Sequence, residues 1–484
     1  MSGAPMALED VLHPWVNRYL GAPGWVQATA GRFYACLPPS LRYGRAYGEF
    51  RAALDATRDA AAARALALAK LEETLAWALD TVPAYQDHRA LAAGGRDPRV
   101  VLRALPVTDK LDIKRQPAHY LSRAMPASAR LTTYTGGSTR TPMQFWLQKH
   151  VTRPREYAFM REVRDRVGSG EGDMVLALRG RTVASAARPG GRPWMYEPVK
   201  RQLVISSEHL ARRYLPLCAA ALARFRPPFI EAFPSALYPL ARWLEAHPLP
   251  EFTRNVRGIT LYSENVYGFQ METLKRVFGC PIVAHYGHSE RVLMAATLPG
   301  DERYFFWPQY GWLELLDAQD RPITEPGKLG FVVGTSFDNR VMPFVRYRTG
   351  DLAMLSGDGR LELAGYPAVE RIAGRLQEFV VCRDERLVSI TALGVAHFPE
   401  LCAVEAIQYE QHKPGELILK VAAEGEIAAR DLRRMATAVA AKTQGGCDVG
   451  ALQVERIERT PRGKSRMLVQ HLDVRRYFGL GVEA

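Results

Sequence analysis

From residue 131 onward, segments typical of strands and segments typical of helices follow one another along the chain. "DMVLAL" and "RQLVIS" have the pattern of strands, and "HLARRYLPLCAAALARF" has the pattern of an amphipathic helix. The alternation continues through "FIEAF", "ALYPLARWLEAH", "VRGITLYS", "ENVYGFQMETLKRVFG" and "PIVAHYG". Strands that alternate with helices pack in layers, because each helix must bury its apolar side against a sheet. The chain is therefore predicted to be an α/β protein with a large layered N-terminal domain.

Two later sections change character. Residues 303–370 contain short strand-like runs separated by Gly and Pro, which predicts a β-rich section and mixed sheets. Beyond Gly374, "VEAIQYEQ", "GELILKVAA", "IAARDLRRMATAVAAK" and "LQVERIER" predict the order strand, strand, helix, strand. A unit of about 110 residues is large enough to fold independently. We therefore expect a domain over residues 1–373 and a small α+β domain over 374–484.

Two segments nearer the N-terminus carry helix signals. The Ala/Arg-rich stretch around residues 52–78 has high helix propensity throughout and is expected to stop at Pro83. "LPVTDKLDIKRQP" predicts a turn followed by a short helix, with Thr108 or Asp109 as the cap.

Composition and charge exclude several classes of protein. The formal net charge is +13, but arginines are spread thinly and mixed with acids, as in "RPREYAFMREVRDR". Such a pattern is typical of solvated helix faces, so we predict attraction for anionic substrates such as nucleotides and no nucleic-acid partner. No apolar run reaches 18 residues, and "MSGAPMALEDVLHPWV" lacks a basic start, so neither a membrane span nor a secretory signal is predicted. The six cysteines form no C-x-x-C pair, which fits a reducing cytoplasm.

The densest cluster of glycines and hydroxyls is "TYTGGSTRTP", Thr133 to Pro142. Backbone N–H groups and hydroxyls in such a loop can bind an anion such as phosphate. The loop lacks the ending of a Walker motif, and the run that follows it is typical of a strand. On its own, an ordinary hairpin turn is the commoner explanation of this composition.

Two further stretches could bind a nucleotide. In "AHYGHSE", Tyr286 could stack on a base and Glu290 could hold a magnesium ion, although a strand-end turn capped by Ser289 explains the same residues. In "FVRYRTGDLAML", Asp351 follows a Thr-Gly turn, where its carboxylate could accept hydrogen bonds from ribose hydroxyls. An aspartate that stabilises its own turn is the alternative.

The last two stretches lie at the domain boundary and near the C-terminus. "IAGRLQEFV" places Arg375 and Glu378 where the two expected domains meet. "ERTPRGKSRML" places Lys464 in a Pro/Gly turn, where an exposed loop lysine is the ordinary explanation. The order and spacing of all five stretches are more specific than any one of them.

Taken together, these stretches resemble the adenylate-forming enzymes of the acyl-CoA synthetase (ANL) superfamily. More narrowly, the chain is similar to the phenylacetate–CoA ligase branch and its capsular-polysaccharide-biosynthesis (CapK-like) relatives. The cues for this branch are "TVPAYQDH", "LPVTDKLDIK", "IEAFPSALYPLARWL" and "GTSFDNRVMPFVRYRTGD". The resemblance covers residues 80 to 470, which is most of the chain.

The resemblance implies a site for ATP, magnesium and an acyl substrate, with a mobile C-terminal domain that turns about the hinge residue Glu378. It implies catalytic roles for Lys464, Glu290 and Arg140, with Glu290 as the metal ligand. The residues implied in nucleotide binding are Thr135, Gly136, Gly137, Ser138, Thr139, Ser263, Glu264, Asn265, His285, Tyr286, Gly287, Ser289, Asp351 and Arg375. The residues implied in the substrate pocket are Phe233, Ser235, Tyr238 and Tyr262.

The chain departs from this family at two of these positions and in one segment. Arg140 stands where the family loop usually has glycine, and arginine adopts a positive φ less easily. A guanidinium beside a triphosphate is nevertheless a good bidentate partner. Glu378 stands where aspartate is typical. Some relatives bind zinc through cysteines before the "GR" turn, whereas "LELAGYPAVERIAGR" has none, so no zinc is predicted.

The implied activity is that of an AMP-forming ligase. A carboxylic acid would react with ATP to give an acyl-adenylate and pyrophosphate, and the acyl group would then pass to coenzyme A. An amide synthetase that uses an amine acceptor is the first alternative, and a relative that binds nucleotide or acyl ligand without turnover is the second. The resemblance predicts a cytoplasmic ligase, with a homodimer as one possible assembly.

Overall fold

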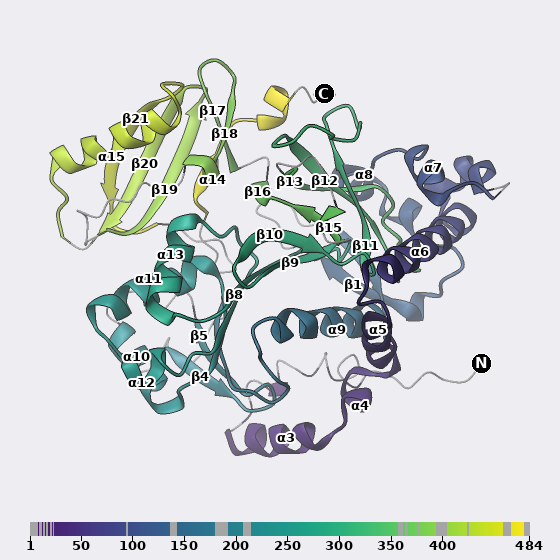
Figure 1. Cartoon of the computed structure of the whole chain (residues 1–484), viewed down its shortest axis with the longest axis horizontal. Helices are drawn as coiled ribbons and strands as arrows, with labels where there is room; N and C mark the ends of the chain where they lie inside the picture. The colour runs from purple at the N-terminus through teal and green to yellow at the C-terminus, as the bar shows by residue number, and fades with distance from the viewer. Residues whose placement is uncertain are drawn as a thin grey trace.

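The computed structural model of the chain describes residues 24–92, 95–135, 143–179, 192–206, 214–356, 362–363, 366–375, 378–393, 404–423, 425–457 and 466–478, together with residues 8, 12, 15, 18–19 and 22. Figure 1 shows a large layered part built from the N-terminal and middle segments. A smaller unit at its side, in yellow-green, contains β19 to β21 and α15.

The central element is a ten-stranded mixed sheet with the order β14-β15-β10-β9-β8-β7-β6-β3-β5-β4. Its strands are β3 (Val175–Arg179), β4 (Trp194–Glu197), β5 (Gln202–Ser206), β6 (Phe229–Ala232), β7 (Gly258–Tyr262), β8 (Ile282–Gly287), β9 (Met294–Leu298), β10 (Asp301–Phe306), β14 (Glu362–Leu363) and β15 (Tyr366–Val369). Strands β5, β3, β6, β7 and β8 are parallel, and the flanking pairs are antiparallel. The predicted α/β class is confirmed.

Helices cover both faces of this sheet (Figure 1). One face packs against α10 (Leu215–Phe225), α11 (Pro234–Ala246), α12 (Pro250–Thr253) and α13 (Gly268–Phe278), in a core that includes Leu222, Leu240 and Leu274. The other face packs against α9 (Thr152–Asp165) through Phe159 and Val163. Helix α13 begins at Gly268, so residues 263–267, predicted in part as helix, instead form a loop at the end of β7.

The β-rich section is a four-stranded antiparallel sheet with the order β11-β12-β13-β16. Its strands are β11 (Gly311–Leu316), β12 (Leu329–Ser336), β13 (Tyr347–Met354) and β16 (Arg371–Arg375). A hairpin of β1 (Arg130–Tyr134) and β2 (Gln144–Gln148) packs on it through Met143, Phe145 and Leu147. Both the β-rich section and the strand after the hydroxyl-rich loop were predicted correctly.

The N-terminal part is helical. It contains α3 (Gly24–Cys36), α4 (Pro39–Tyr43), α5 (Arg45–Ala56), α6 (Ala60–Thr81), η2 (Pro83–Ala92), α7 (Pro98–Arg103), α8 (Lys110–Arg115), η3 (Pro117–Tyr120) and η4 (Ala127–Ala129). The Ala/Arg-rich stretch is two helices rather than one, because the chain breaks at residues 57–59 and Asp59 caps α6 by accepting from the Ala62 N–H. Asp109 caps α8 through the N–H groups of Leu111 and Asp112, which decides between the two predicted caps.

The C-terminal part begins with a hairpin and continues as an open sheet with the order β21-β20-β19-β22. Its elements are β17 (Phe379–Val381), β18 (Leu387–Ser389), α14 (Ile390–Leu393), β19 (Val404–Lys413), β20 (Glu416–Ala423), α15 (Ala429–Lys442), β21 (Asp448–Val454), β22 (Leu468–Gln470) and η9 (Val474–Phe478). Leu417, Leu419, Met435 and Val439 form its core. The predicted order strand, strand, helix, strand is confirmed, and the domain boundary near Gly374 stays a prediction.

None of the helices in the described part of the chain combines the length and apolar character that a membrane span requires.

Candidate active site

Strand β8 places Tyr286 at the junction of the two large sheets. The Tyr286 ring packs edge-on against Phe306, with ring centroids 5.7 Å apart. Its hydroxyl donates a hydrogen bond to Oδ2 of Asp351 on β13, at 2.8 Å. Burial raises the pKa of Tyr286 well above its ordinary value, so the phenol stays protonated and acts as a donor. The contact joins two stretches that the sequence analysis assigned to nucleotide binding.

Arg375 approaches the same carboxylate from β16. Asp351 and Arg375 are opposite each other in the antiparallel pair of β13 and β16, and Nε of Arg375 lies 3.2 Å from Oδ1 of Asp351. The nearby Asp351 carboxylate raises the pKa of the guanidinium further. Each Asp351 oxygen thus accepts from one of these two side chains, and a carboxylate oxygen has a further lone pair with which it can accept from a ribose hydroxyl.

Glu290 lies beyond the end of β8 and is only 9% exposed. Its Oε1 accepts a hydrogen bond from the Tyr347 hydroxyl at 3.0 Å. Glu290 is near enough to Arg375 to raise the pKa of that guanidinium. Its carboxyl group is thus buried and bonded to β13, the strand that also carries Asp351, and a carboxyl oxygen in such a place could bind magnesium beside a nucleotide.

Lys110 is a candidate residue that the sequence analysis missed. Burial lowers the pKa of Lys110, the Glu290 carboxylate raises it, and the Arg375 guanidinium lowers it further. Thr108, two residues before Lys110, exchanges backbone hydrogen bonds with Arg346 and Arg348, on either side of Tyr347. The signal available in the sequence was a cationic residue, Lys110, directly after the helix cap Asp109 in "VTDK". The pattern was used only to predict the start of a helix.

The loop after β7 connects the nucleotide-binding candidates to the predicted hinge. Ser263 has a positive φ of 67°. Glu264 accepts hydrogen bonds from the backbone N–H and the hydroxyl of Ser235, each at 3.0 Å, and so joins the loop to the start of α11. Nδ2 of Asn265 donates to Oε2 of Glu378 at 2.6 Å. Burial raises the pKa of Glu378 to about 7.

The predicted acyl-pocket residues divide into two groups. The Phe233 and Tyr262 rings meet edge to face with centroids 5.3 Å apart, at the ends of β6 and β7. Tyr238 instead packs against Phe269, with ring centroids 5.0 Å apart, where helices α11 and α13 meet.

His285, a candidate for nucleotide binding on β8, has a buried Nε2 without a hydrogen-bond partner among the described residues.

Gly287 and Ser289 follow Tyr286 along the same segment. Gly287 is the last residue of β8, and Ser289 lies half-buried beside Glu290. The segment therefore leads directly from the Tyr286 contact to the buried carboxylate.

Part of the predicted site lies outside the described residues. Gly136, Gly137, Ser138, Thr139, Arg140 and Lys464 belong to this group. Thr135 and Met143, at the two ends of the hydroxyl-rich loop, are among the described residues. The Thr135 N–H donates to the Met143 carbonyl, and the Met143 N–H donates to the Thr135 hydroxyl, both at 2.9 Å. These two hydrogen bonds hold the two ends of the hydroxyl-rich loop together.

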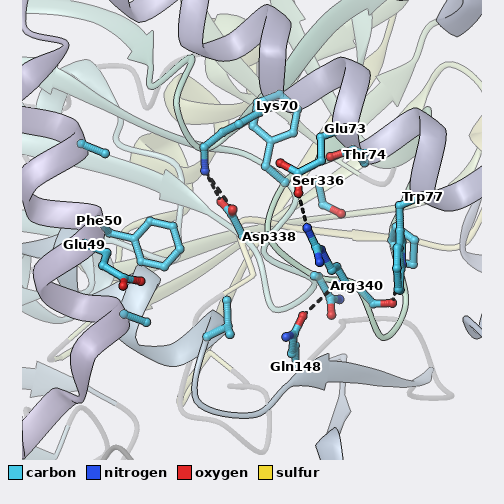
Figure 2. A pocket seen from close by; sticks show the side chains of 16 residues that line it. Glu49, Phe50, Lys70, Glu73, Thr74, Trp77, Gln148, Ser336, Asp338 and Arg340 are labelled. Atoms are coloured by element: carbon cyan, nitrogen blue, oxygen red, sulfur yellow. Dashed lines mark hydrogen bonds and ion pairs between the residues drawn. The ribbon is translucent and has the colours of Figure 1, made fainter. Parts of the chain in front are cut away.

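A cavity of about 400 Å³ lies elsewhere, between α5, α6, β2 and the segment after β12. Figure 2 shows Lys70 paired with Asp338 across it, and the Arg340 backbone N–H bonded to Gln148. Arg340 also pairs with Glu73. No residue predicted for the active site lines this cavity.

Two solved structures of one ligase have a fold similar to that of this chain. The structure is similar to 2-hydroxyisobutyryl-CoA ligase in the postadenylation state in complex with R3-HIB-AMP, with a TM-score of 0.62 and 17% sequence identity, over 88% of this chain and 93% of that one. The same ligase in complex with 2-HIB-AMP gives a TM-score of 0.60 and 16% identity over 88% and 93%. The fold is that of an adenylate-forming ligase. No protein-family model matches the sequence, and no curated protein sequence matches it either.

Proposed function

We propose that this protein activates a carboxylic acid with ATP to form an acyl-adenylate and pyrophosphate, and then transfers the acyl group to the thiol of coenzyme A. One observation carries the proposal most strongly: Asp351 accepts from Tyr286 on one oxygen and from Arg375 on the other. Three stretches that are far apart in sequence thus meet at one carboxylate. The structures that this chain is similar to are of a CoA ligase with an acyl-AMP.

In this proposal, Asp351 binds the ribose hydroxyls while Tyr286 and Arg375 orient its carboxylate. Tyr286 also offers its ring face to the adenine, beside the loop of Ser263 to Asn265. Glu290 is a hard oxygen donor of the kind that magnesium prefers, and it would hold the ion. The residues that would contact the phosphates are those of the hydroxyl-rich loop, from Thr135 to Pro142, including Arg140.

The chemistry requires positioning and charge neutralisation rather than a general base. The substrate carboxylate is already ionised at neutral pH, so its oxygen can attack the α-phosphorus directly. The new P–O bond forms as the bond to pyrophosphate breaks, and pyrophosphate carries the electron pair away. In our proposal, Lys464 offsets the charge that gathers on the α-phosphate oxygens. In the second step the thiol sulfur attacks the acyl carbon, its proton is lost, and AMP leaves.

The substrate class is argued from the residues that the resemblance implies in the acyl pocket. Phe233 and Tyr262 form an aromatic wall at the ends of β6 and β7. An aromatic or medium-sized apolar acid fits such a wall by burying its apolar surface. This substrate class agrees with the resemblance to the phenylacetate–CoA ligase branch, which we retain as part of the proposal.

The test is pyrophosphate release across a panel of aromatic and aliphatic carboxylic acids, with coenzyme A or simple amines supplied in turn. We expect release with an aromatic or apolar acid and a thioester product when coenzyme A is present. An amide product would assign the acceptor to the amines. Absence of release with every acid would favour a protein that binds nucleotide or acyl ligand without turnover.

Lys464→Ala tests the two-step mechanism. Adenylation should be nearly abolished, whereas thioester formation from a preformed acyl-adenylate should continue. Lys413→Ala is the matched control, because Lys413 is an exposed lysine of the same C-terminal part. Equal loss in both steps would refute the role of Lys464.

A further inference from the structure

Strand pairing in the C-terminal sheet brings three metal-ligating side chains together. Strands β19 and β22 run parallel, with Glu410 opposite Val469 and Gln411 opposite Gln470. The residues that follow Gln411 and Gln470 are His412 and His471, and their rings stack with centroids 4.0 Å apart and an interplanar angle of 10°. Because side chains two residues apart in a strand share a face, Glu410 lies beside this pair.

The donor atoms of the three residues form a small triangle. Oε1 of Glu410 lies 2.9 Å from Nε2 of His471 and 3.3 Å from Nε2 of His412. One ligand atom from each residue lies within 4.8 Å of the others. Ligand atoms on a tetrahedral zinc ion with bonds of about 2.0 to 2.1 Å are roughly 3.3 Å apart, so the triangle has nearly the size that an ion requires.

We propose that Glu410, His412 and His471 form a binding site for a divalent transition-metal ion, with zinc as the ion that fits best. This site is separate from the cysteine-free segment before the "GR" turn, from which no zinc was predicted. Two imidazoles and one carboxylate are a donor set that zinc accepts, and a fourth position stays open to water. The stacked rings must turn so that their lone pairs converge on the ion. Both histidine side chains can do so, since their exposed fractions are 54% and 40%.

Lys420 determines which carboxylate oxygen is available. Its Nζ lies 2.6 Å from Oε2 of Glu410, on the side away from the histidine contacts. This ion pair orients Glu410 and leaves Oε1 directed at the two imidazoles. A partner that holds the second oxygen of a ligating carboxylate is a common supporting feature of metal sites. Lys420 is therefore a positioning residue and is not a ligand.

The ion would join β22 to β19. Three residue pairs connect these strands, and β22 lies at the edge of the sheet. A bond from His471 to an ion shared with Glu410 and His412 would hold this edge strand in register. Lys464 lies four residues before β22, so the ion would also stabilise the strand that follows the proposed adenylation lysine. This last consequence rests on the proposed function, whereas the metal site does not.

Zinc titration of chelator-treated protein without an affinity tag tests the proposal, with cobalt(II) absorption as the readout of coordination. We expect one ion per chain and a higher melting temperature with zinc. His412→Ala and His471→Ala should each weaken affinity at least about tenfold, since even supporting residues of metal sites contribute that much. His119→Ala removes an exposed histidine elsewhere and should leave affinity unchanged.

Lys420→Gln provides the second comparison, because it keeps all three ligands and should still bind zinc. Two results would overturn the site: no zinc binding by the intact protein, or equal binding by the double variant His412→Ala/His471→Ala. Circular dichroism of each variant shows whether it is folded. A loss of zinc binding with normal pyrophosphate release would separate this site from the proposed function.

Discussion

Asn265 donates a hydrogen bond to Glu378 across 2.6 Å, and so connects the loop after β7 to the residue at which the chain enters the C-terminal part. Gly374 lies against this pair with a φ of 98°. A Cβ atom on Gly374 would come within 2.0 Å of Oε2 of Glu378 and 2.5 Å of Nδ2 of Asn265. A side chain at position 374 would therefore overlap both atoms of the Asn265–Glu378 hydrogen bond, which could not form in its present geometry.

Gly374→Ala should displace Glu378 and destabilise the protein by more than the cost of backbone strain alone. Gly327→Ala is the matched control, because its φ is 71° and its added Cβ would meet nothing within 4 Å. Strain of that kind costs about 1 to 2 kcal/mol. We expect Gly374→Ala to exceed the control in loss of melting temperature and to slow pyrophosphate release. Equal effects of the two substitutions would show that position 374 needs only the positive φ.

The raised pKa of Glu378 predicts a stability that depends on pH. Below pH 4.5, its ordinary pKa, the carboxyl is protonated in both the folded and the unfolded state and contributes nothing. Between 4.5 and about 7 the unfolded state ionises first, so the folded state loses stability, and the loss is complete above about 7. Glu378→Gln avoids this loss. Its melting temperature should match that of the unchanged protein near pH 4.5 and exceed it increasingly up to pH 7.

Glu426→Gln, an exposed glutamate of the same C-terminal part, should show no such trend. A constant difference between Glu378→Gln and the unchanged protein at every pH would contradict the raised pKa. The measurement is thermal unfolding from pH 4 to 8 at constant ionic strength.

Local patterns in the sequence were sufficient to predict much of the fold. The strands β3, β5, β6, β7 and β8, and the sequence of strands and helix along the C-terminal part, follow from apolar periodicity and turn residues, which are local properties. The break between α5 and α6 could not be predicted from propensity, because alanine-rich residues lie on both sides of it. That break is set by tertiary packing, since α5 packs with α9 on the large sheet whereas α6 packs against Phe337 and Val345.

The candidate active site was predictable only in part, because tertiary packing also decides which of its residues meet. Asp351 and Arg375 were both candidates, but their pairing depends on the register of β13 with β16, which no local pattern specifies. The hydrogen bond from Tyr286 to Asp351 crosses between two sheets and depends on how those sheets pack. Lys110 was missed because the influence of Glu290 on its pKa depends on tertiary structure, including backbone contacts of Thr108 with residues more than 200 positions away.

Tyr286→Phe should weaken ATP binding while leaving the ring in place. The substitution removes the donor to Oδ2 of Asp351, which leaves the carboxylate held by Arg375 alone. A hydrogen bond to a charged group contributes about 1.5 to 3 kcal/mol, so the KM for ATP should rise roughly 10- to 150-fold at most. Tyr196→Phe is the control, since Tyr196 lies on the edge strand β4 and stacks on Phe225. An unchanged KM in Tyr286→Phe would remove the hydroxyl from the nucleotide site.

Lys110→Ala tests the lysine whose pKa is influenced by both Glu290 and Arg375. Adenylation concentrates negative charge from ATP near these residues, and a nearby ammonium would offset it. Loss of such a charged contact should lower kcat/KM for ATP at least about tenfold. Lys114→Ala, one turn later on α8 and exposed, should change it less than about twofold, because exposed charges contribute little. Steady-state kinetics at varied ATP, together with melting temperatures, separates the two roles. A large kinetic loss with unchanged stability would support a contact to substrate, whereas equal kinetics in the two variants would place Lys110 outside the site.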